Sequence, residues 1–320
     1  MTRDDISFLV SPVDRSPLSF QSDDTLIDQS GRLFSVVNGI PRFVEEKNYA
    51  SSFGLQWNLF CRTQIDKYNG TTITRDRFLA STHWDLGALR GQRVLEVGSG
   101  AGRFTQIVLD AGADVFSVDY SNAVEANLKN NGPHPHLHLC QADIYALPFK
   151  EEYFDKVFCL GVLQHTPDVK KAFLSMIPFL KRGGEIAIDV YRKNRFTFLF
   201  SSYYWYRPIT KRMNKEVLLK TIRALVPWLL PVSSALLCLP RGGRLLSRLI
   251  PVANYSQTFP EFSREQLLEW SVMDTFDNLA PAYDQPQTLE SVRSWFEEAG
   301  LEILYCGPGG VGSVGIGRKP

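Results

Sequence analysis

Strand-like and helix-like hydrophobic patterns alternate along the middle of the chain. Between residues 91 and 191, short apolar and β-branched runs such as RVLEVG and DVFSVD are separated by stretches with helical spacing, among them RFTQIVLDAG and PDVKKAFLSMIPFLKRGG. The alternation resumes over residues 288–320, with one helical stretch and two strand-like runs. Strands that alternate with helices predict a parallel sheet covered on both faces. We therefore predict an α/β fold with a doubly wound, mostly parallel sheet, built from residues 91–191 and 288–320.

The regions outside this predicted core have different patterns. Residues 1–45 consist of short apolar runs broken by turn signals such as DRSP and DQSGR, which predict a small β-rich module. Residues 46–90 are polar with a helical pattern, and we expect helices that precede the core. Residues 192–287 interrupt the core with an aromatic and basic segment, which we interpret as a helical insertion or lid.

Composition and charge narrow the class of protein. The 320 residues are 44% apolar and 22% charged, which is ordinary for a globular chain with a sizeable core. The formal charge of +1 argues against a surface that coats nucleic acid. The five cysteines are scattered and form no C-x-x-C pair, so we expect reduced thiols and a cytoplasmic location. The N-terminal stretch MTRDDISFLVSP is too polar for a signal peptide.

The run VLEVGSGAGRFT carries three glycines, Gly98, Gly100 and Gly102, directly after a predicted strand. Glycine allows a ligand to approach the backbone closely, and a helix N-terminus beyond it offers free amide groups and a positive dipole. Ligands of open parallel sheets bind at the carboxyl ends of the strands. We therefore predict that this loop cradles a nucleotide-like ligand with a negative group. The spacing fits neither a dinucleotide fingerprint nor a P-loop.

Acidic residues at three strand ends refine this prediction. Glu96 lies two residues before the first glycine, where a carboxylate could attract a cationic ligand. Asp119 ends the next strand, where an acidic side chain can bind two ribose hydroxyls. Asp143 follows the third strand, where its side chain could accept from an adenine amino group while Ile144 packs on the ring.

Together, LEVGSGAGRF, VDYS, QADIYALPF, FDKVFCLGVLQHTPD and LKRGGEIAI resemble class I S-adenosylmethionine-dependent methyltransferases, in the same order over about a hundred residues. The resemblance implies a seven-stranded sheet and S-adenosyl-L-methionine as cofactor. It further implies that the glycine loop approaches the amino-acid portion of the cofactor and that Asp119 holds the ribose. By the same resemblance, Tyr120 lies beside the adenine, which Asp143 and Ile144 bind. Gly161 would face the methionine chain.

The N-terminal segment resembles the Trm112-like zinc-ribbon module found in front of some bacterial methyltransferases. That module carries two C-x-x-C pairs, whereas the matching positions here are Ser11, Asp14, Asp28 and Gly31. These residues cannot rebuild a tetrahedral zinc site. We therefore predict a degenerate ribbon without structural zinc, which a metal assay on the purified protein would test.

The stretches SFGLQWNLF and RDRFLASTHW resemble the helices that precede the core in the same methyltransferases. Gln56, Trp57 and Arg77 are therefore candidates for contact with cofactor or substrate. The alternative is that Trp57 and Phe60, three residues apart, only fill the core from one helix face.

His165, in the run LGVLQHTPD, is the candidate catalytic base. It follows the fourth predicted strand, and imidazole titrates near neutral pH, which suits proton removal from an acceptor. The alternative is a structural histidine in the turn before Pro167. Related methyltransferases of quinone precursors have acidic residues for a metal in this segment. Here those positions carry Val162, Leu163 and Gln164, so we expect no catalytic metal.

The insertion is the main indication of the substrate. Tyr191 before it, and Tyr255 and Tyr283 within it, are further candidates for an acceptor pocket. Residues 192–250 contain twelve Lys or Arg and one acidic residue, together with the uncharged run ALVPWLLPVSSALLCLP. Three interpretations stay open: a structural cap, a lid, or peripheral contact with an anionic membrane. Basic and aromatic residues also suit single-stranded nucleic acid, but no RNA-binding spacing supports that partner.

The sequence thus predicts a methyltransferase that acts on a small-molecule acceptor or on one linked to a lipid or glycan. The alternative is a non-catalytic cofactor-binding or scaffold protein that retains the fold. The intact set of Gly98, Gly100, Gly102, Asp119 and Asp143 favours retained cofactor binding.

Overall fold

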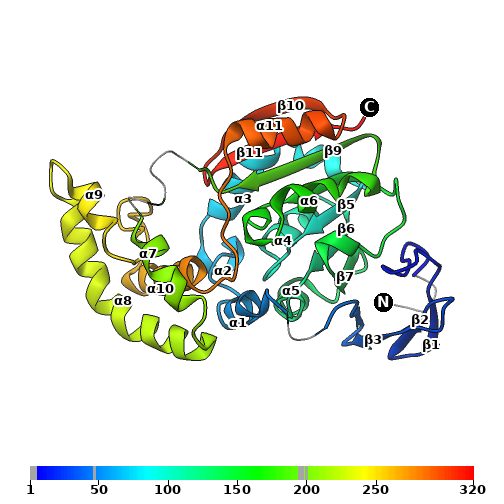
Figure 1. Ribbon diagram of the computed structural model, residues 1–320, viewed down its shortest axis with the longest axis horizontal. Helices are drawn as coiled ribbons and strands as arrows, with labels where there is room; N and C mark the ends of the chain where they lie inside the picture. The colour runs from blue at the N-terminus through cyan, green and yellow to red at the C-terminus, as the bar shows by residue number, and fades with distance from the viewer. Residues whose placement is uncertain (1–5, 46–47, 194–197, 199–200) are drawn as a thin grey trace.

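Within the described part of the chain, seven strands form one mixed sheet in the order β10–β11–β9–β8–β5–β6–β7 (Figure 1). The computed structural model describes residues 6–45, 48–193, 198 and 201–320; the other parts of the predicted module, pre-core region and insertion lie outside these residues. Strands β5 to β9 pair in parallel, and β11 is antiparallel to both of its neighbours. The predicted α/β fold with a mostly parallel seven-stranded sheet is confirmed. The strands are β5 (Arg93–Val97), β6 (Asp114–Asp119), β7 (Leu137–Gln141), β8 (Phe154–Cys159), β9 (Leu180–Val190), β10 (Glu302–Pro308) and β11 (Ser313–Arg318).

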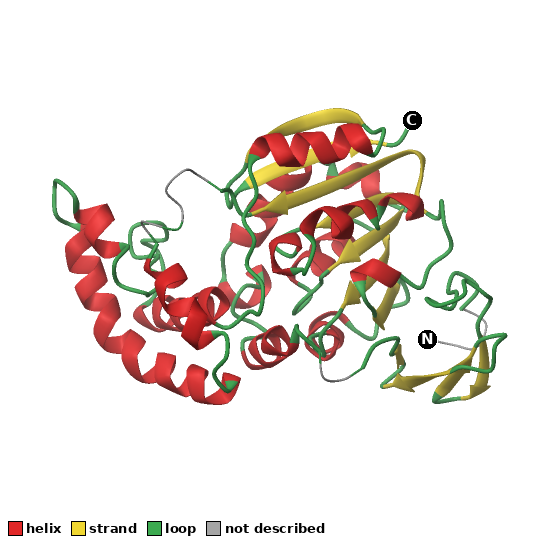
Figure 2. Ribbon diagram, viewed as in Figure 1, coloured by secondary structure: helices red, strands yellow, loops and turns green. Residues whose placement is uncertain are grey.

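Helices cover both faces of this sheet (Figure 2). Successive strand residues point to opposite faces: Leu95 belongs to the core cluster with α6 (Val169–Leu174) and α11 (Leu289–Glu298), whereas Val94 belongs to the cluster with α4 (Arg103–Asp110). Both faces are therefore buried, which explains why apolar residues point to both faces of these strands. α3 (Ile73–Thr82) joins α4 on its face, and α5 (Val124–Asn131) packs beside β7.

The strand order reverses next to β5, which lies between β6 and β8. Neighbouring loops at the carboxyl ends of these strands therefore diverge to opposite sides and leave a crevice. The glycine loop follows β5, Tyr120 follows β6 and Gly161 follows β8. The topology thus brings the three predicted cofactor segments to one edge.

One predicted helix is much shorter than the sequence pattern suggested. The stretch from Pro167 to Gly184 was expected to be helical throughout, but α6 ends at Leu174 and β9 already begins at Leu180. Pro178 explains the early end, because it has no amide hydrogen and its ring clashes with the carbonyl four residues earlier.

The N-terminal residues form a separate antiparallel sheet of β1 (Ser19–Ser22), β2 (Thr25–Ile27), β3 (Leu33–Val37) and β4 (Ile40–Pro41). This module extends the β7 edge of the main sheet, because the Phe43 amide donates to the Gln141 carbonyl at 2.8 Å. The rings of Phe8 and Phe116 pack edge to face at 4.8 Å, so the module shares a core with the main sheet.

The positions that match the zinc ligands of the resembled ribbon bond to one another. The buried Ser11 hydroxyl donates to Asp28 Oδ2 at 2.9 Å. The other carboxylate oxygen of Asp28 accepts from the amides of Ser30 and Arg32 at 3.0 and 2.8 Å. Asp14 accepts from the Ser16 hydroxyl at 2.7 Å. Hydrogen bonds therefore stabilise the two turns at residues 11–16 and 28–32.

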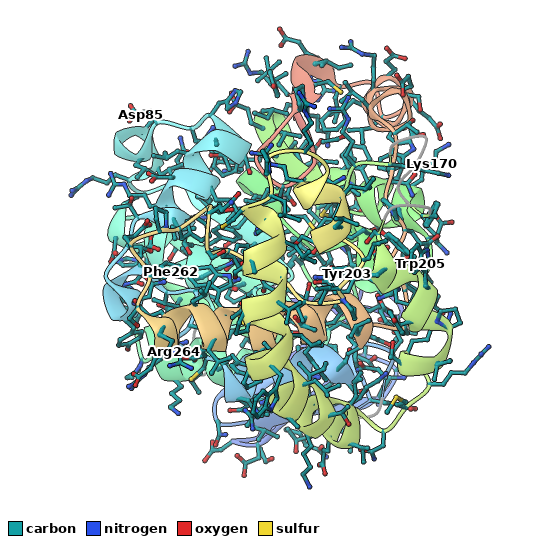
Figure 3. All side chains as sticks on the ribbon, turned by 90° about the vertical axis from the view of Figure 1, so that its left-hand side faces the viewer. Asp85, Lys170, Tyr203, Trp205, Phe262 and Arg264 are labelled. Atoms are coloured by element: carbon teal, nitrogen blue, oxygen red, sulfur yellow. The ribbon has the colours of Figure 1, made fainter. Side chains whose placement is uncertain are left out.

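The region before the core forms α1 (Ser51–Leu59), α2 (Asp66–Asn69) and α3. After β9 the chain forms α7 (Ser202–Thr210), α8 (Lys215–Leu237), α9 (Gly243–Ser247) and α10 (Arg264–Leu279). α10 begins with a capping box, in which the Ser263 hydroxyl and the Gln266 side chain bond to each other's backbone amides. α7, α8 and α9 form a helical arm at one end of the molecule, which faces the viewer in Figure 3. α10 connects this arm to α1.

Candidate active site

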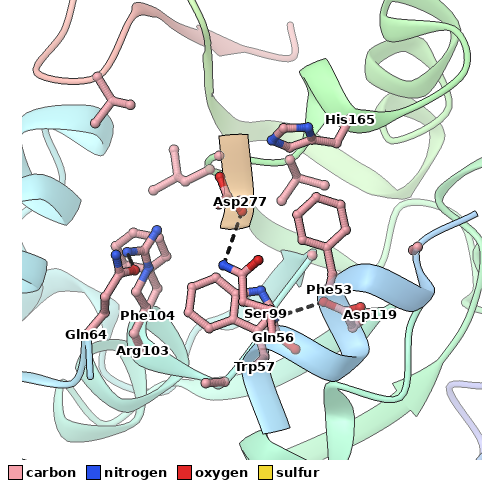
Figure 4. A pocket seen from close by; sticks show the side chains of 18 of the residues that line it. Phe53, Gln56, Trp57, Gln64, Ser99, Arg103, Phe104, Asp119, His165 and Asp277 are labelled. Carbon is pink, nitrogen blue, oxygen red and sulfur yellow. Dashed lines mark hydrogen bonds between the residues drawn. The ribbon is translucent and has the colours of Figure 1, made fainter. Parts of the chain in front are cut away.

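A cavity of about 380 Å³ lies at the carboxyl ends of β5, β6 and β8 (Figure 4). Its walls come from the pre-core helices α1 and α3, from residues at the carboxyl ends of β5, β6, β7, β8 and β9, and from α10 with the segment before it. Segments more than two hundred residues apart therefore meet around one space, which has the dimensions of a ligand site.

The glycine loop forms the floor of this cavity. Gly98 has a φ of +84°, and a Cβ there would lie 2.3 Å from a methyl carbon of Val162. Gly100 has a φ of +53°, and its Cβ would lie 3.0 Å from the Trp57 indole nitrogen. Only glycine fits both positions, because the φ values and the close neighbours exclude a side chain. Gly102 is the N-cap of α4, so the amide end of that helix points toward the loop.

Asp119 joins the end of β6 to the glycine loop. One carboxylate oxygen accepts from the Gly100 amide at 2.8 Å, and the other accepts from the Ser121 amide and hydroxyl at 2.8 and 2.7 Å. The residue is 9% exposed and lines the cavity. Burial raises the pKa of Asp119, which the hydrogen bonds partly oppose. Oδ1 already accepts twice, but Oδ2 retains a lone pair, so the carboxylate can also accept from a hydroxyl group of a ligand.

Aromatic and aliphatic side chains line the cavity near Asp119. The Tyr49 and Tyr120 rings lie 4.8 Å apart with an interplanar angle of 34°, and both line the cavity with Ile144. Burial raises the pKa of Tyr120, and the nearby Asp143 contributes. Asp143 itself caps the turn at Ile144 by accepting from the Tyr145 amide at 3.0 Å. It does not belong to the recorded lining of the cavity, so the structure gives it a backbone role.

Glu96 lies behind the loop and not on the cavity wall. It is fully buried between β5, β6 and α4, where it accepts from the Ser117 hydroxyl at 2.8 Å and from the Thr105 hydroxyl. Asn127 of α5 donates to both of those hydroxyl oxygens. Burial raises the pKa of Glu96 to about 7. The expected direct attraction of a cationic ligand therefore has no support in its position, because the strand turns this side chain toward the helices.

Two arginines border Gly161 on the opposite side of the cavity. Arg77 of α3 forms an ion pair of 2.9 Å with Asp189, whose carboxylate also accepts from the Gly161 amide. Arg103 of α4 donates to the side-chain oxygen of Gln64, and among the described residues no ion pair is recorded for it. Burial and the neighbouring Arg77 lower the pKa of Arg103 to about 9. A buried cation of this kind favours an anionic group on a bound molecule.

His165 faces the cavity with a defined tautomer. Its Nδ1 lies 3.0 Å from the carbonyl oxygen of Tyr283, and because a carbonyl only accepts, Nδ1 carries the hydrogen. Nε2 therefore has a free lone pair in the neutral ring. This atom is buried, and no hydrogen-bond partner is recorded for it among the described residues. The Phe53 and Tyr191 rings hold the imidazole, at 5.0 and 5.5 Å. The geometry suits a proton acceptor directed at a bound molecule.

The far wall comes from α10, which sequence reasoning missed. Asp274 and Asp277 lie three residues apart on one helix face and line the cavity. Asp277 accepts from Gln56 at 3.2 Å and from the Tyr191 hydroxyl at 3.3 Å. Asp274 accepts from the Trp270 indole at 3.1 Å. Burial, followed by the nearby Asp277, raises the pKa of Asp274 to about 7. Two acidic residues three positions apart among buried apolar residues are the sequence pattern that could have identified this wall.

Aromatic side chains complete this wall. Tyr255, Phe259 and Trp270 line the cavity, with the Tyr255 and Phe259 rings stacked at 5.6 Å. Of the candidate acceptor residues, Tyr191 and Tyr255 lie on the cavity, whereas Tyr283 contributes its backbone carbonyl to His165. Within the described ranges, no group of three or more His, Cys, Asp or Glu side chains is arranged to hold a metal ion.

Part of the chain is similar to known methyltransferases. Residues 95–188 match a protein-family profile described as a methyltransferase domain. The ubiquinone/menaquinone biosynthesis C-methyltransferase UbiE of Vibrio campbellii is 36% identical over 115 residues, which cover 33% of this chain and 44% of that protein. The enzyme of the same name from Edwardsiella ictaluri is 33% identical over 184 residues, covering 55% of this chain and 65% of that protein. The chain thus matches less than two thirds of the length of these relatives.

A solved structure is similar over most of both chains. It is the complex between the Haloferax volcanii Trm112 methyltransferase activator and a methyltransferase, with a TM-score of 0.46 and 12% identity over 84% of this chain and 97% of that chain.

Proposed function

We propose that this chain, which carries a class I S-adenosylmethionine-dependent methyltransferase domain, transfers a methyl group to a small-molecule acceptor or to one linked to a lipid or glycan. One observation carries the proposal. The glycine loop, Asp119 and His165 line the same cavity, and Nε2 of His165 has no hydrogen-bond partner among the described residues. A cofactor site and a proton acceptor thus share one space.

The residues on the cavity wall fit the cofactor. The glycine loop leaves its backbone open to the ligand, because side chains are excluded at Gly98 and Gly100. Asp119 would accept from a ribose hydroxyl, and the Tyr49 and Tyr120 rings with Ile144 would pack on the adenine ring. Arg103 would pair with the carboxylate of the methionine portion, since this buried cation forms no ion pair with another described residue.

When bound, the cofactor supplies an electrophilic methyl group, and the protein contributes alignment and proton removal. For a hydroxyl acceptor, His165 Nε2 would take the hydroxyl proton as the S–CH3 bond of the cofactor breaks and the O–CH3 bond forms, with S-adenosylhomocysteine as the leaving group. The Tyr283 carbonyl holds the ring in the tautomer that this step requires. Asp277 and Tyr191 would orient polar groups of the acceptor, because both lie on the wall opposite the glycine loop.

The relatives support a small acceptor. Two of them are named as C-methyltransferases of ubiquinone and menaquinone biosynthesis. Tyr255, Phe259 and Trp270 give this cavity an aromatic wall that suits a ring. We further propose that residues 192–287 serve as a lid over the acceptor, and that the protein works in the cytoplasm.

The test is a methyl-transfer screen with S-adenosylhomocysteine formation as the readout. Phenols, sugar hydroxyls and prenyl-linked glycans would be offered to the full chain, with Asp119→Ala as the control. We expect turnover on one acceptor class and its loss in the control. Cofactor binding without transfer to any class would favour the non-catalytic alternative, and failure to bind S-adenosylmethionine would overturn the proposal altogether.

A further inference from the structure

The longest helix of the chain buries only one of its faces. Leu218, Ile222, Val226 and Leu230 of α8 point inward and join the cluster around Phe276 of α10. This spacing of three and four residues forms a single apolar stripe along the helix. Through this stripe α8 packs on α10, whereas residues on the opposite face of the helix are exposed.

The outward face of α8 is also apolar (Figure 3). Leu225 is 50% exposed, Trp228 78% and Val232 52%, and they follow one another at the helical spacing of three and four. Leu239 after α8, and Leu245 and Leu246 of α9, are also exposed. Isolated exposed apolar residues are ordinary, but a row that includes a nearly free indole indicates an interaction surface. We call these six residues the apolar row.

Basic residues flank the apolar row on both sides. Between Ala224 and Pro240 no residue is charged, whereas Lys220 and Arg223 precede this run and Arg241, Arg244 and Arg248 follow it, all exposed. Residues 192–250 contain twelve Lys or Arg and a single acid, although the whole chain has a net charge of only +1. The segment that carries this row is therefore much more basic than the rest of the chain.

The residue types on this surface indicate the class of partner that it would bind. Tryptophan, leucine and valine flanked by Lys and Arg suit the boundary of an anionic bilayer, where the apolar groups enter the acyl region and the cations meet the headgroups. A second copy of the chain would bring the same basic residues face to face, which like-charge repulsion opposes. Charge complementarity therefore favours lipid over self-association.

The geometry also decides how the helix would meet the bilayer. α8 is long and apolar enough to cross a membrane by length and composition, but a third of its most apolar window is buried inside the protein. Pro227 and Pro231 lie within it. Its inner stripe is committed to α10, so only the outer face is available. Such a helix lies along a membrane surface and does not span it.

We propose that the outward face of α8 and α9 binds the surface of an anionic lipid bilayer through the apolar row and its flanking Lys and Arg. This goes beyond methyl transfer and does not depend on it. It also gives a physical reason for a lipid-linked acceptor, because Tyr255 and Phe259 of the cavity wall follow α9 directly in the chain.

The experiment is vesicle co-sedimentation of the full chain. Vesicles of phosphatidylcholine alone and with about one third phosphatidylglycerol would be compared at low and high salt. We expect binding to the anionic vesicles only, and at least tenfold weaker binding in high salt, where screening shortens the reach of charge to a few ångströms. Equal binding to neutral and anionic vesicles, or no binding to either, would overturn the proposal.

Trp228→Glu is the variant that tests the row, because its exposed side chain contributes little to folding. Val13→Glu is the matched control: Val13 is also exposed, at 58%, but lies in the N-terminal module. We expect Trp228→Glu to bind anionic vesicles at least tenfold more weakly, and Val13→Glu to bind like the unmodified chain. Cofactor titration checks that both variants are folded. If sedimentation velocity shows a dimer that Trp228→Glu disrupts, the surface belongs to a second copy and the lipid proposal is wrong.

Discussion

At the residue scale, single neighbours set the chemistry of the cavity side chains. The Tyr283 carbonyl fixes the hydrogen of His165 on Nδ1 and leaves Nε2 free to accept a proton. The Gly100 and Ser121 amides hold the Asp119 carboxylate against the glycine loop. Neither contact is between residues adjacent in sequence, and each can be tested by one substitution.

Replacing His165 with Ala should lower turnover by about 10²–10⁴-fold, the usual contribution of a positioned general base. The cofactor Kd should not change, because the contacts proposed for the cofactor lie on the glycine loop, Asp119 and Arg103. Steady-state kinetics and calorimetry measure the two quantities. His134→Ala, at an exposed position, is the control. Full activity in His165→Ala would mean that this histidine only stabilises the turn and does not act as a base.

Replacing Asp119 with Ala should weaken cofactor binding by roughly 10- to 150-fold, which corresponds to about 1.5–3 kcal/mol for hydrogen bonds to a charged group. Asp119→Asn should lose less, because its amide oxygen still accepts from the Gly100 amide. Calorimetric titration with S-adenosylhomocysteine gives both values. Tight binding of NAD with none of S-adenosylmethionine would contradict the assignment of the loop.

At the element scale, one buried carboxyl connects β5, β6 and α4. Glu96 accepts from Ser117 and Thr105, and Asn127 of α5 extends the network. The network fixes the start of α4 relative to the sheet, and therefore the shape of the glycine loop between them. Its contribution to stability depends on pH, because one oxygen of Glu96 is buried without a recorded partner among the described residues.

Glu96→Gln should reduce the pH dependence of stability. Burial raises the pKa of Glu96 from 4.5 to about 7, so the folded state keeps a proton that the unfolded state releases. The free energy of unfolding therefore falls as pH rises from about 4.5 to about 7, by up to about 3 kcal/mol, and then levels off. Gln has no proton to lose, so this part of the fall should disappear in the variant.

Urea denaturation at several pH values between 4 and 8 measures this difference. The pKa of Asp274 is also raised to about 7, but Asp274 is present in both proteins and its contribution cancels in the comparison. Parallel pH curves for the two proteins would mean that the pKa of Glu96 is the same in the folded and the unfolded state.

At the scale of the whole molecule, the insertion both supplies one wall of the cavity and forms the helical arm. α10 and the segment before it supply Asp274, Asp277, Tyr255 and Phe259 to the wall, while α8 and α9 face outward. Acceptor recognition and any contact with a membrane therefore reside in one continuous segment.

Phe259→Ala should raise the acceptor KM by about tenfold and leave the cofactor Kd unchanged. Removing a ring from the wall loses roughly 1–2 kcal/mol of apolar contact with the acceptor. Phe262→Ala is the matched control, because its ring stacks on Phe259 at 5.0 Å but does not belong to the recorded cavity lining. Equal effects of the two variants would indicate a loss of packing in the insertion and not of acceptor contact.

The sequence alone determined the sheet and the position of its loops. A glycine-rich run after a strand, and acidic or aromatic residues after the next ones, identify the carboxyl ends of a parallel sheet, because strand alternation and turn chemistry are local properties. Gly98, Asp119, Tyr120 and Ile144 accordingly lie on one cavity. The prediction from the local pattern was wrong at one helix end, because α6 ends at Leu174, four residues before Pro178.

Only the tertiary structure decided what faces the cavity. Glu96 has the spacing of a ligand-binding acid, yet the sheet turns it toward the helices. Asp274 and Asp277 reach the cavity because α10 packs against α1, which lies some two hundred residues earlier in the chain. The direction and pairing of a side chain depend on such long-range packing. Local sequence patterns do not contain this information, since they report only the spacing along one element.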